Sequence, residues 1–120
     1  MSFIERLFGR RRVAAQPAAQ LLSDAIRAVT HECKVSAPTL EGAAMPLMRV
    51  PDAHSIDVWY SVETNDDLSA ARRAGLENSL DEKTRDLLAR NGYLRATGQV
   101  VFVSLHSRQE IKEAGQYYLR

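Results

Sequence analysis

The sequence predicts an α+β fold, in which a small, mostly antiparallel sheet of three to four strands has helices packed on one face. Segments with helical spacing and segments with strand alternation are interspersed along the chain. The clearest pair of strands is separated by a short run of turn residues, which indicates an antiparallel hairpin. At 120 residues, of which 45% are apolar and 26% charged, the chain can bury one core but not two. We therefore divide it into a helical N-terminal extension, residues 1–16, and a single domain, residues 17–120.

The first long helix is predicted over residues 17–33. Pro17 suits the first position of a helix, where the missing N–H of proline is not needed. Four residues recur at steps of four, three and four, and therefore share one face: Leu22, Ile26, Val29 and Cys33. We expect this face to pack on the core, with Cys33 as a small buried hydrophobic residue.

Two strands are expected to follow as a hairpin. Residues 43–50 have the pattern of a short strand, and Pro46 confines it to a sheet edge because proline cannot donate to an interior ladder. The turn chemistry of Pro51 and Asp52 separates it from residues 55–63, which alternate in polarity. One side of this second strand is apolar and carries Ile56, Val58, Tyr60 and Val62. The other side carries Asp57, Trp59, Ser61 and Glu63.

Two helices are predicted in the next segment. Residues 64–67 resemble a helix start with acids in the first turn, and this helix leads to Gly75. The Ser and Glu that bound residues 79–82 have the spacing of a capping box, so the second helix is expected over residues 80–90. The Asn-Gly pair at 91–92 supplies a left-handed stop for it.

Residues 99–105 have the strongest strand pattern in the chain. One face carries Val100 and Phe102, and the other carries Val101, Val103 and Leu105. Two apolar faces favour a central position in the sheet. Ser107 and Glu110 repeat the capping-box spacing, so a brief helix is expected up to Gly115. Residues 116–119 are expected to form either a last strand or a packed tail.

Cysteine usage and the apolar runs indicate the compartment. The single cysteine excludes an intramolecular disulfide and a cysteine-based metal cluster within one chain, so a reducing cytoplasm fits. A secretory signal needs an unbroken apolar stretch of about 7 to 15 residues, whereas Gln16, Pro17 and Gln20 interrupt residues 13–22. No apolar run reaches the roughly 18 residues of a membrane-spanning helix. A mitochondrial presequence stays open as an alternative, because residues 1–22 hold four Arg and one acid.

The first twelve residues combine an apolar side with a basic cluster. The apolar residues are Phe3, Ile4, Leu7 and Phe8, and the arginines that follow are Arg10, Arg11 and Arg12. With Glu5 and Arg6, residues 1–12 have a formal charge of +3, which leaves −2 for residues 13–120 of the total of +1. Such a segment suits an anionic membrane surface or an acidic groove on another protein. The mildly acidic body argues against a nucleic-acid partner, since phosphate binding needs a basic face.

No catalytic, metal-binding or nucleotide-binding motif in the sequence is complete. The His-Glu pair at 31–32 resembles the start of a zinc-protease helix, but Val35 stands where the second His ligand is needed. Cys33 with His54 or His106 would form a nucleophilic site only within hydrogen-bonding reach. No glycine-rich loop follows a strand and opens a helix to hold phosphates. We therefore expect no metal and no cofactor.

Trp59 is unusual on the polar side of its strand, where its neighbours are Asp57, Ser61 and Glu63. A large aromatic residue on a polar face is typical of a protein-binding hot spot. The alternative is that a helix covers this face and buries the indole in the core. The sequence therefore predicts a protein-binding surface made of Asp57, Trp59, Ser61 and Glu63.

Three functions are consistent with these patterns. The first is a non-enzymatic protein-binding module of the cytoplasm. Bacterial adaptors, regulators and immunity-type proteins have a similar size. The second adds peripheral attachment to the inner face of an anionic membrane through residues 1–12. The third is a small enzyme whose site would be drawn from Cys33, His54, His106 and Asp57. The sequence predicts neither the identity of the partner nor the oligomeric state.

Overall fold

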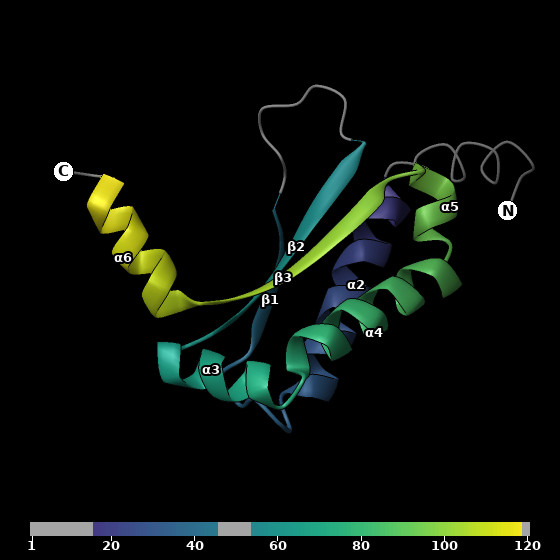
Figure 1. Cartoon of the computed structure of the whole chain (residues 1–120). Helices are drawn as coiled ribbons and strands as arrows, with labels where there is room; N and C mark the ends of the chain where they lie inside the picture. The colour runs from purple at the N-terminus through teal and green to yellow at the C-terminus, as the bar shows by residue number, and fades with distance from the viewer. Residues whose placement is uncertain (1–15, 46–53, 119–120) are drawn as a thin grey trace, which may run out of the picture.

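The computed structural model describes residues 16–45 and 54–118, which form the predicted α+β fold (Figure 1). The described chain starts with helix α2 (Gln16–Cys33), strands β1 (Glu41–Met45) and β2 (Ser55–Val62), and helices α3 (Asn65–Arg73) and α4 (Leu76–Arg90). Helix α5 (Tyr93–Thr97), strand β3 (Val100–Ser107) and helix α6 (Arg108–Tyr118) follow. The predicted N-terminal helical extension lies, up to residue 15, outside the described residues.

The sheet has the strand order β1-β2-β3, with β2 in the centre. β1 and β2 are antiparallel, which confirms the predicted hairpin and the edge position of its first strand. β1 begins at Glu41, two residues before the predicted start at 43, and the predicted strand residues 46–50, with Pro46, lie outside the described residues. β2 and β3 are parallel, so the sheet is mixed rather than mostly antiparallel. The parallel pairing follows from the connection, because α3, α4 and α5 bring the chain back along the sheet before β3 begins.

β3 lies at an edge of the sheet, so the predicted central position of residues 99–105 is wrong. Both of its faces are apolar, but only one is buried. Val101 and Leu105 are 2% and 1% exposed, whereas Val100 and Phe102 on the other face are 55% and 54% exposed. An apolar pattern does not distinguish a face that a helix covers from a face that the fold leaves open.

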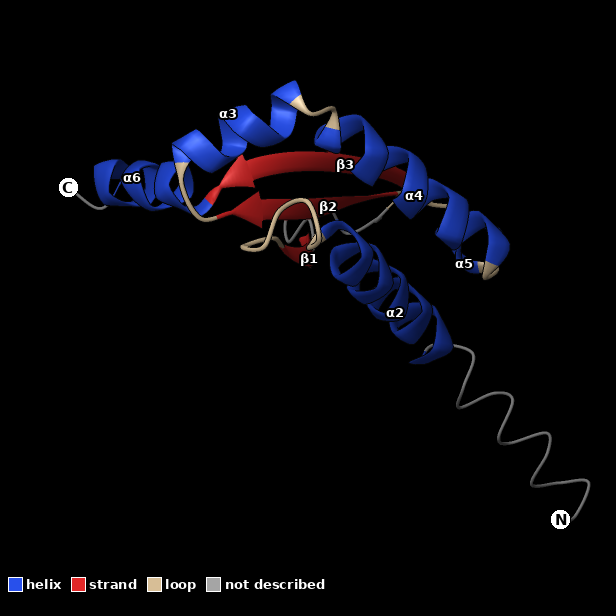
Figure 2. Cartoon of the chain, turned by 90° about the horizontal axis from the view of Figure 1, so that it is seen from below, coloured by secondary structure: helices blue, strands red, loops and turns tan. Residues whose placement is uncertain are grey.

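Helices α2, α3 and α4 pack on one face of the sheet, as predicted (Figures 1 and 2). The core between these layers contains fully buried side chains from both, among them Val29, Leu40, Val58, Leu80, Leu88 and Leu105. The predicted inner face of the first helix is confirmed, because four of its residues are buried in this core: Leu22, Ile26, Val29 and Cys33.

Two close approaches fix the helices against the sheet. The hydroxyl oxygens of Tyr60 on β2 and Thr84 on α4 lie 2.7 Å apart, and both side chains are fully buried. Next to them, a Cβ atom added at Gly42 of β1 would lie 2.8 Å from atoms of Ile26 and Thr30 on α2. β1 can therefore approach α2 this closely only because position 42 is a glycine.

The starts of α3 and α4 follow different rules. Thr64 caps α3 as predicted, because its Oγ1 accepts a backbone N–H of the first turn at 3.1 Å. α4 begins at Leu76, so the predicted capping box at 79–82 is wrong and Ser79 lies inside the helix. Gly75 adopts a left-handed conformation, with φ of 76°, and turns the chain from α3 directly into α4. The burial of Leu76 favours this earlier start.

The predicted end of α4 is confirmed, whereas the predicted end of α6 is wrong. The Asn-Gly pair at 91–92 ends α4 as predicted, although the short α5 after it was not predicted. Ser107 Oγ accepts the backbone N–H of Glu110 at 2.9 Å, which confirms the Ser107 cap of the second predicted capping box. α6 then continues through Gly115 to Tyr118, so the predicted stop and the predicted last strand are both wrong. A glycine inside a helix costs only about 1 kcal/mol, which does not by itself end a helix.

Candidate functional site

The side of the sheet opposite to the helices, here called the open face, is the candidate site. It includes these outward-facing residues of the three strands: Glu41, Ala43, Asp57, Trp59, Ser61, Val100, Phe102, Ser104 and His106. The residues between them on each strand point the other way, toward the helices. No helix in residues 16–45 or 54–118 lies over this face, and α6 projects away from the end of β3 (Figures 1 and 2).

An apolar cluster occupies the open face. Val100 and Phe102 on β3 are both more than half exposed. Trp59 on β2 lies opposite Ser104, so Phe102 is its diagonal neighbour, within reach of an aromatic side chain. The indole of Trp59 also packs on the imidazole of His106, with ring centroids 4.2 Å apart. Large apolar side chains that gather on one exposed surface are typical of interaction sites.

His106 also forms a hydrogen bond on this face, because its Nε2 lies 2.8 Å from Ser104 Oγ. A Ser–His hydrogen bond is one part of a nucleophilic site, which also needs a group that orients the imidazole. Among the described contacts of His106, the other partner is the indole of Trp59 and not a carboxylate. The bond therefore holds the imidazole in position against the indole.

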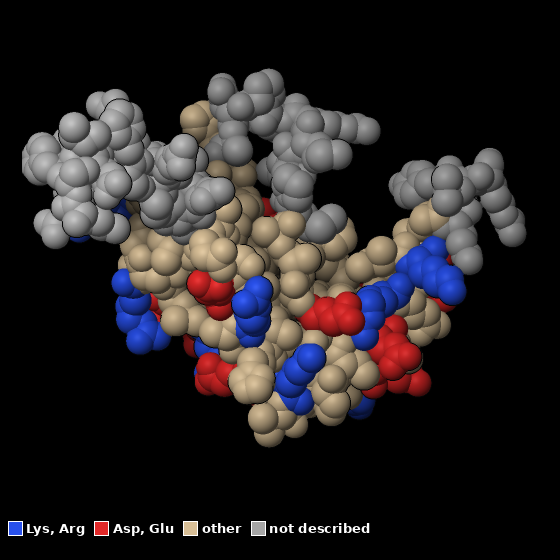
Figure 3. Space-filling view, turned by 180° about the vertical axis from the view of Figure 1, so that it is seen from behind, with Lys and Arg blue, Asp and Glu red and all other residues tan. Residues whose placement is uncertain are grey.

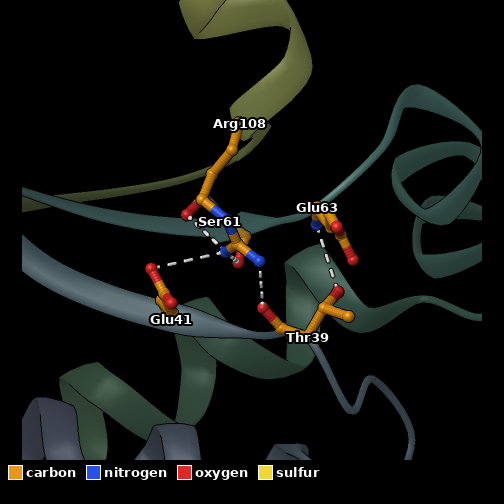
Figure 4. A network of polar contacts seen from close by, with 5 residues as sticks. All are labelled: Thr39, Glu41, Ser61, Glu63 and Arg108. Carbon is orange, nitrogen blue, oxygen red and sulfur yellow. Dashed lines mark hydrogen bonds and ion pairs between the residues drawn. The ribbon is translucent and has the colours of Figure 1, made fainter.

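Arg108 links the three strands at one end of the open face (Figure 4). Its Nη1 donates to the carbonyl oxygen of Ser61 at 3.1 Å, and its Nη2 donates to the carbonyl oxygen of Thr39 at 2.8 Å. Glu41 Oε2 lies 3.5 Å from the same Nη1. The Thr39 hydroxyl accepts the backbone N–H of Glu63 at 3.1 Å. These contacts fix the start of β1, the end of β2 and the start of α6 relative to one another.

Three of the four predicted protein-binding residues lie on the open face. Asp57, Trp59 and Ser61 alternate along β2 and point away from the helices. Glu63 follows the last residue of β2 and is exposed. The alternative, a helix that buries Trp59, is not found in the part of the chain that the structure describes. The predicted membrane or partner contacts lie outside the described residues: Phe3, Ile4, Leu7, Phe8, Arg10, Arg11 and Arg12.

Sequence reasoning missed the part of the open face that β3 supplies. Val100, Phe102 and His106 complete the surface around Trp59. Their signal in the sequence is the second apolar stripe of residues 99–105, which fits a second buried face equally well. The parallel register that places these side chains beside Trp59 depends on tertiary structure and has no local signal.

The candidate Cys/His site is not assembled in the described structure. Cys33 is 5% exposed on the helix side of the sheet, which confirms its predicted place in the core. Burial raises the pKa of its thiol, and the nearby Lys83 opposes this rise only in part. Asp57 and His106 lie on the opposite face, and His54 is exposed just before β2. A buried thiol with a raised pKa is a weak nucleophile.

Charged side chains are distributed over the surface with both signs mixed. In the view from behind, basic and acidic side chains are interspersed over the lower part of the molecule (Figure 3). Arg72, Arg85 and Arg90 each have a nitrogen within 3.1 Å of a carboxylate oxygen on the same or a neighbouring helix. No group of three or more His, Cys, Asp or Glu side chains in the described segments is placed to hold a metal ion. None of the helices described here has the length and apolar character that spanning a membrane requires.

The fold and the open face define an α+β domain that leaves one face of its sheet, with an aromatic cluster, uncovered by its described helices. In comparisons with known proteins, no protein-family model, no curated protein and no solved structure matches the chain. A function for this domain is therefore inferred from the geometry and chemistry of its own residues.

Proposed function

We propose that this chain is a non-enzymatic protein-binding module of the cytoplasm that docks on a partner protein through the open face. The observation that supports this proposal is the apolar cluster of the open face, in which Val100 and Phe102 are more than half exposed and Trp59 is half-buried. Such side chains gain nothing from contact with water, whereas their burial against a partner contributes about 25 cal/mol per Å² of apolar surface. Binding is the role that gives this cluster a favourable environment.

The charged groups of the open face indicate the chemistry of the partner. Asp57 lies directly opposite Phe102 in the register, and Glu63 follows the end of β2. The guanidinium of Arg108, in contrast, already has Glu41 within 3.5 Å. An apolar centre with a polar rim is the usual anatomy of a protein interface, and the rim charges select the partner. We therefore expect the partner to present an apolar patch that is bordered by basic side chains.

The aromatic part of the open face is ordered before a partner binds. Trp59 packs on His106, and His106 is held by its hydrogen bond with Ser104. A side chain that is already in one position loses less conformational entropy on binding. Because tryptophan is also enriched among hot spots, we expect Trp59 to contribute more affinity than any other residue of the open face.

The test is affinity capture with the full chain and with two variants, Trp59→Ala and Phe102→Ala. Proteins recovered from an extract of the source organism are quantified by mass spectrometry, and the Kd of each is then measured with purified components. We expect each variant to weaken binding of the true partner about tenfold or more, the effect of losing a hot-spot aromatic.

The matched control is Val35→Ala. Val35 is 89% exposed in the turn after α2, so this variant also removes exposed apolar surface, but not from the open face. Circular dichroism verifies that all three variants are folded. Equal recovery of every partner by the full chain, Trp59→Ala and Phe102→Ala would contradict the proposal.

A further inference from the structure

The two edge strands of the sheet, β3 and β1, differ in the hydrogen bonds that described side chains make to their backbone. At the β3 edge, the guanidinium of Arg72 on α3 donates to the carbonyl oxygen of Leu105 at 3.2 Å. At the β1 edge, the described hydrogen bonds include none from a side chain to the backbone of Glu41–Met45. An edge strand presents alternate N–H and C=O groups that a further strand can pair with. Within the described structure, β1 is therefore the edge available for strand addition.

A groove runs along this edge, between β1 and α2. It has a volume of about 740 Å³, and its apolar lining includes Leu22, Ile26 and Leu40. The middle of the strand contributes small residues to it, Gly42, Ala43 and Ala44, and Glu41 at the start of the strand also lines it. The middle of the edge is thus not blocked by large side chains of its own strand. β1 has five residues, which at about 3.4 Å per residue matches an added segment of roughly the same length.

The charged groups that line the groove are mainly basic. Arg27 and His31 line the groove from α2, and Lys34 lines it from the turn that follows this helix. The nearest described carboxylate to Arg27 is Asp24, at 4.0 Å, in a pair that is more than half exposed and therefore weak. Glu41 also lines the groove, but its carboxylate lies 3.5 Å from Arg108. A ligand in the groove thus meets basic groups that attract an anionic segment.

We propose that the α2–β1 groove binds an extended, acidic segment of a partner protein, which pairs with β1 as an additional strand. Backbone hydrogen bonds to β1 provide the register, apolar side chains at alternate positions enter the groove, and carboxylates meet Arg27 and Lys34. The charge of the groove selects against the chain's own first twelve residues, whose formal charge is +3. Of the residues named for the open face, only Glu41 and Ala43 on β1 also line the groove, and this proposal does not depend on the proposed function of the open face.

The experiment uses the full chain, labelled with ¹⁵N, and a capped peptide with the sequence Val-Thr-Glu-Thr-Val-Thr-Glu. In an extended peptide the Val and Glu side chains share one face, so they can enter the groove together. We expect saturable shifts of the amide signals of Gly42, Ala43 and Ala44. Because the N–H groups of an antiparallel strand point alternately to its two sides, we expect new protection from hydrogen exchange only for those amides of β1 that point away from β2. The peptide with Lys in place of Glu should bind at least about tenfold more weakly. Equal binding of both peptides, or shifts confined to other elements, would overturn the proposal.

Charge reversal at the groove has a matched control. The double variant Arg27→Glu and Lys34→Glu should weaken binding of the acidic peptide about tenfold or more. Arg73→Glu combined with Arg95→Glu makes the same change in net charge at exposed positions of α3 and α5, and should leave the affinity unchanged. Equal affinities of the two double variants would refute a role for the basic groups of the groove.

Two further results distinguish strand addition at β1 from binding at the open face and from an edge that is already occupied. Phe102→Ala removes an aromatic side chain of the open face from β3, the edge of the sheet opposite to β1, and should leave peptide binding unchanged. A failure of the open face as a partner site would therefore not mimic a failure of the groove. If the amides of β1 that point away from β2 are already protected in the free chain, the edge is occupied by another part of the chain or by a second copy. Analytical ultracentrifugation then distinguishes a second copy from another part of the same chain. Occupation of the edge by either of them would overturn the proposal.

Discussion

The indole of Trp59 and the imidazole of His106 lie with their ring centroids 4.2 Å apart and their planes inclined by 32°. The two residues come from parallel strands, and His106 lies two pairs beyond Ser104, the direct neighbour of Trp59 in the register. Their contact covers part of the indole on the face that the described helices leave open. The environment of Trp59 therefore reports on the integrity of the open face.

Removal of the imidazole should be visible in tryptophan fluorescence. The chain has one tryptophan, so its emission comes from Trp59 alone. We expect His106→Ala to shift the emission maximum to longer wavelength, because the indole loses a packing partner and gains contact with water. His31→Ala, an exposed position on α2, is the control and should not change the spectrum. An unchanged emission maximum in His106→Ala would show that the two rings do not pack in solution.

The buried hydrogen bond between Tyr60 and Thr84 predicts a stability effect. Tyr60→Phe removes one hydroxyl and leaves the Thr84 hydroxyl buried without this partner. An unpaired buried polar group costs about 1 to 3 kcal/mol, so we expect the free energy of unfolding to fall by that amount. Urea denaturation measures it. Adding Thr84→Val should recover part of the loss, since both polar groups are then absent. A double variant as unstable as the sum of both single variants would contradict this coupling.

Stability should also depend on pH through Tyr60. Burial raises its pKa from 10.0 to about 12, and the hydrogen bond with Thr84 lowers it to a smaller extent. Because the folded state favours the neutral phenol, this stabilisation is complete below pH 10.0 and is lost as the pH rises through about 12. Burial also raises the pKa of Tyr93, which adds to the same alkaline decline.

The measurement is the free energy of unfolding in urea across this alkaline range, for the full chain and for Tyr60→Phe. We expect the full chain to lose stability more steeply with rising pH than the variant, in which only the other titrating groups contribute. Parallel declines in the two proteins would show that the phenol of Tyr60 does not contribute to the pH dependence.

Glycine positions give a prediction with opposite signs at two sites. A Cβ at Gly42 would lie 2.8 Å from three neighbouring atoms, so we expect Gly42→Ala to destabilise the fold by about 1 to 3 kcal/mol. Gly115 lies in α6 with nothing within 4 Å of such a Cβ. Gly115→Ala should therefore be neutral or stabilise by up to about 1 kcal/mol, because alanine favours the helix. Thermal unfolding compares the two, and an equal Tm for both variants would contradict the close approach of β1 and α2.

Local sequence patterns predicted most of the elements and the inner face of the sheet. The alternation of residues 55–63, the apolar spacing of the first helix and the cap at Ser107 all act over a few residues, so the sequence alone reveals them. The start of α4 and the end of α6 were mispredicted, since burial of Leu76 and the helical conformation of Gly115 override the local capping signals.

For the candidate site, the sequence determined that Asp57, Trp59 and Ser61 share one side of a strand, because side chains alternate with a period of two. Only the tertiary structure decided which apolar faces are covered. β3 has two apolar faces in the sequence, and the helices bury Val101 and Leu105 while Phe102 stays exposed beside Trp59. Burial depends on how distant segments pack, and the parallel register of β2 and β3 is set by a connection of three helices rather than by any local pattern.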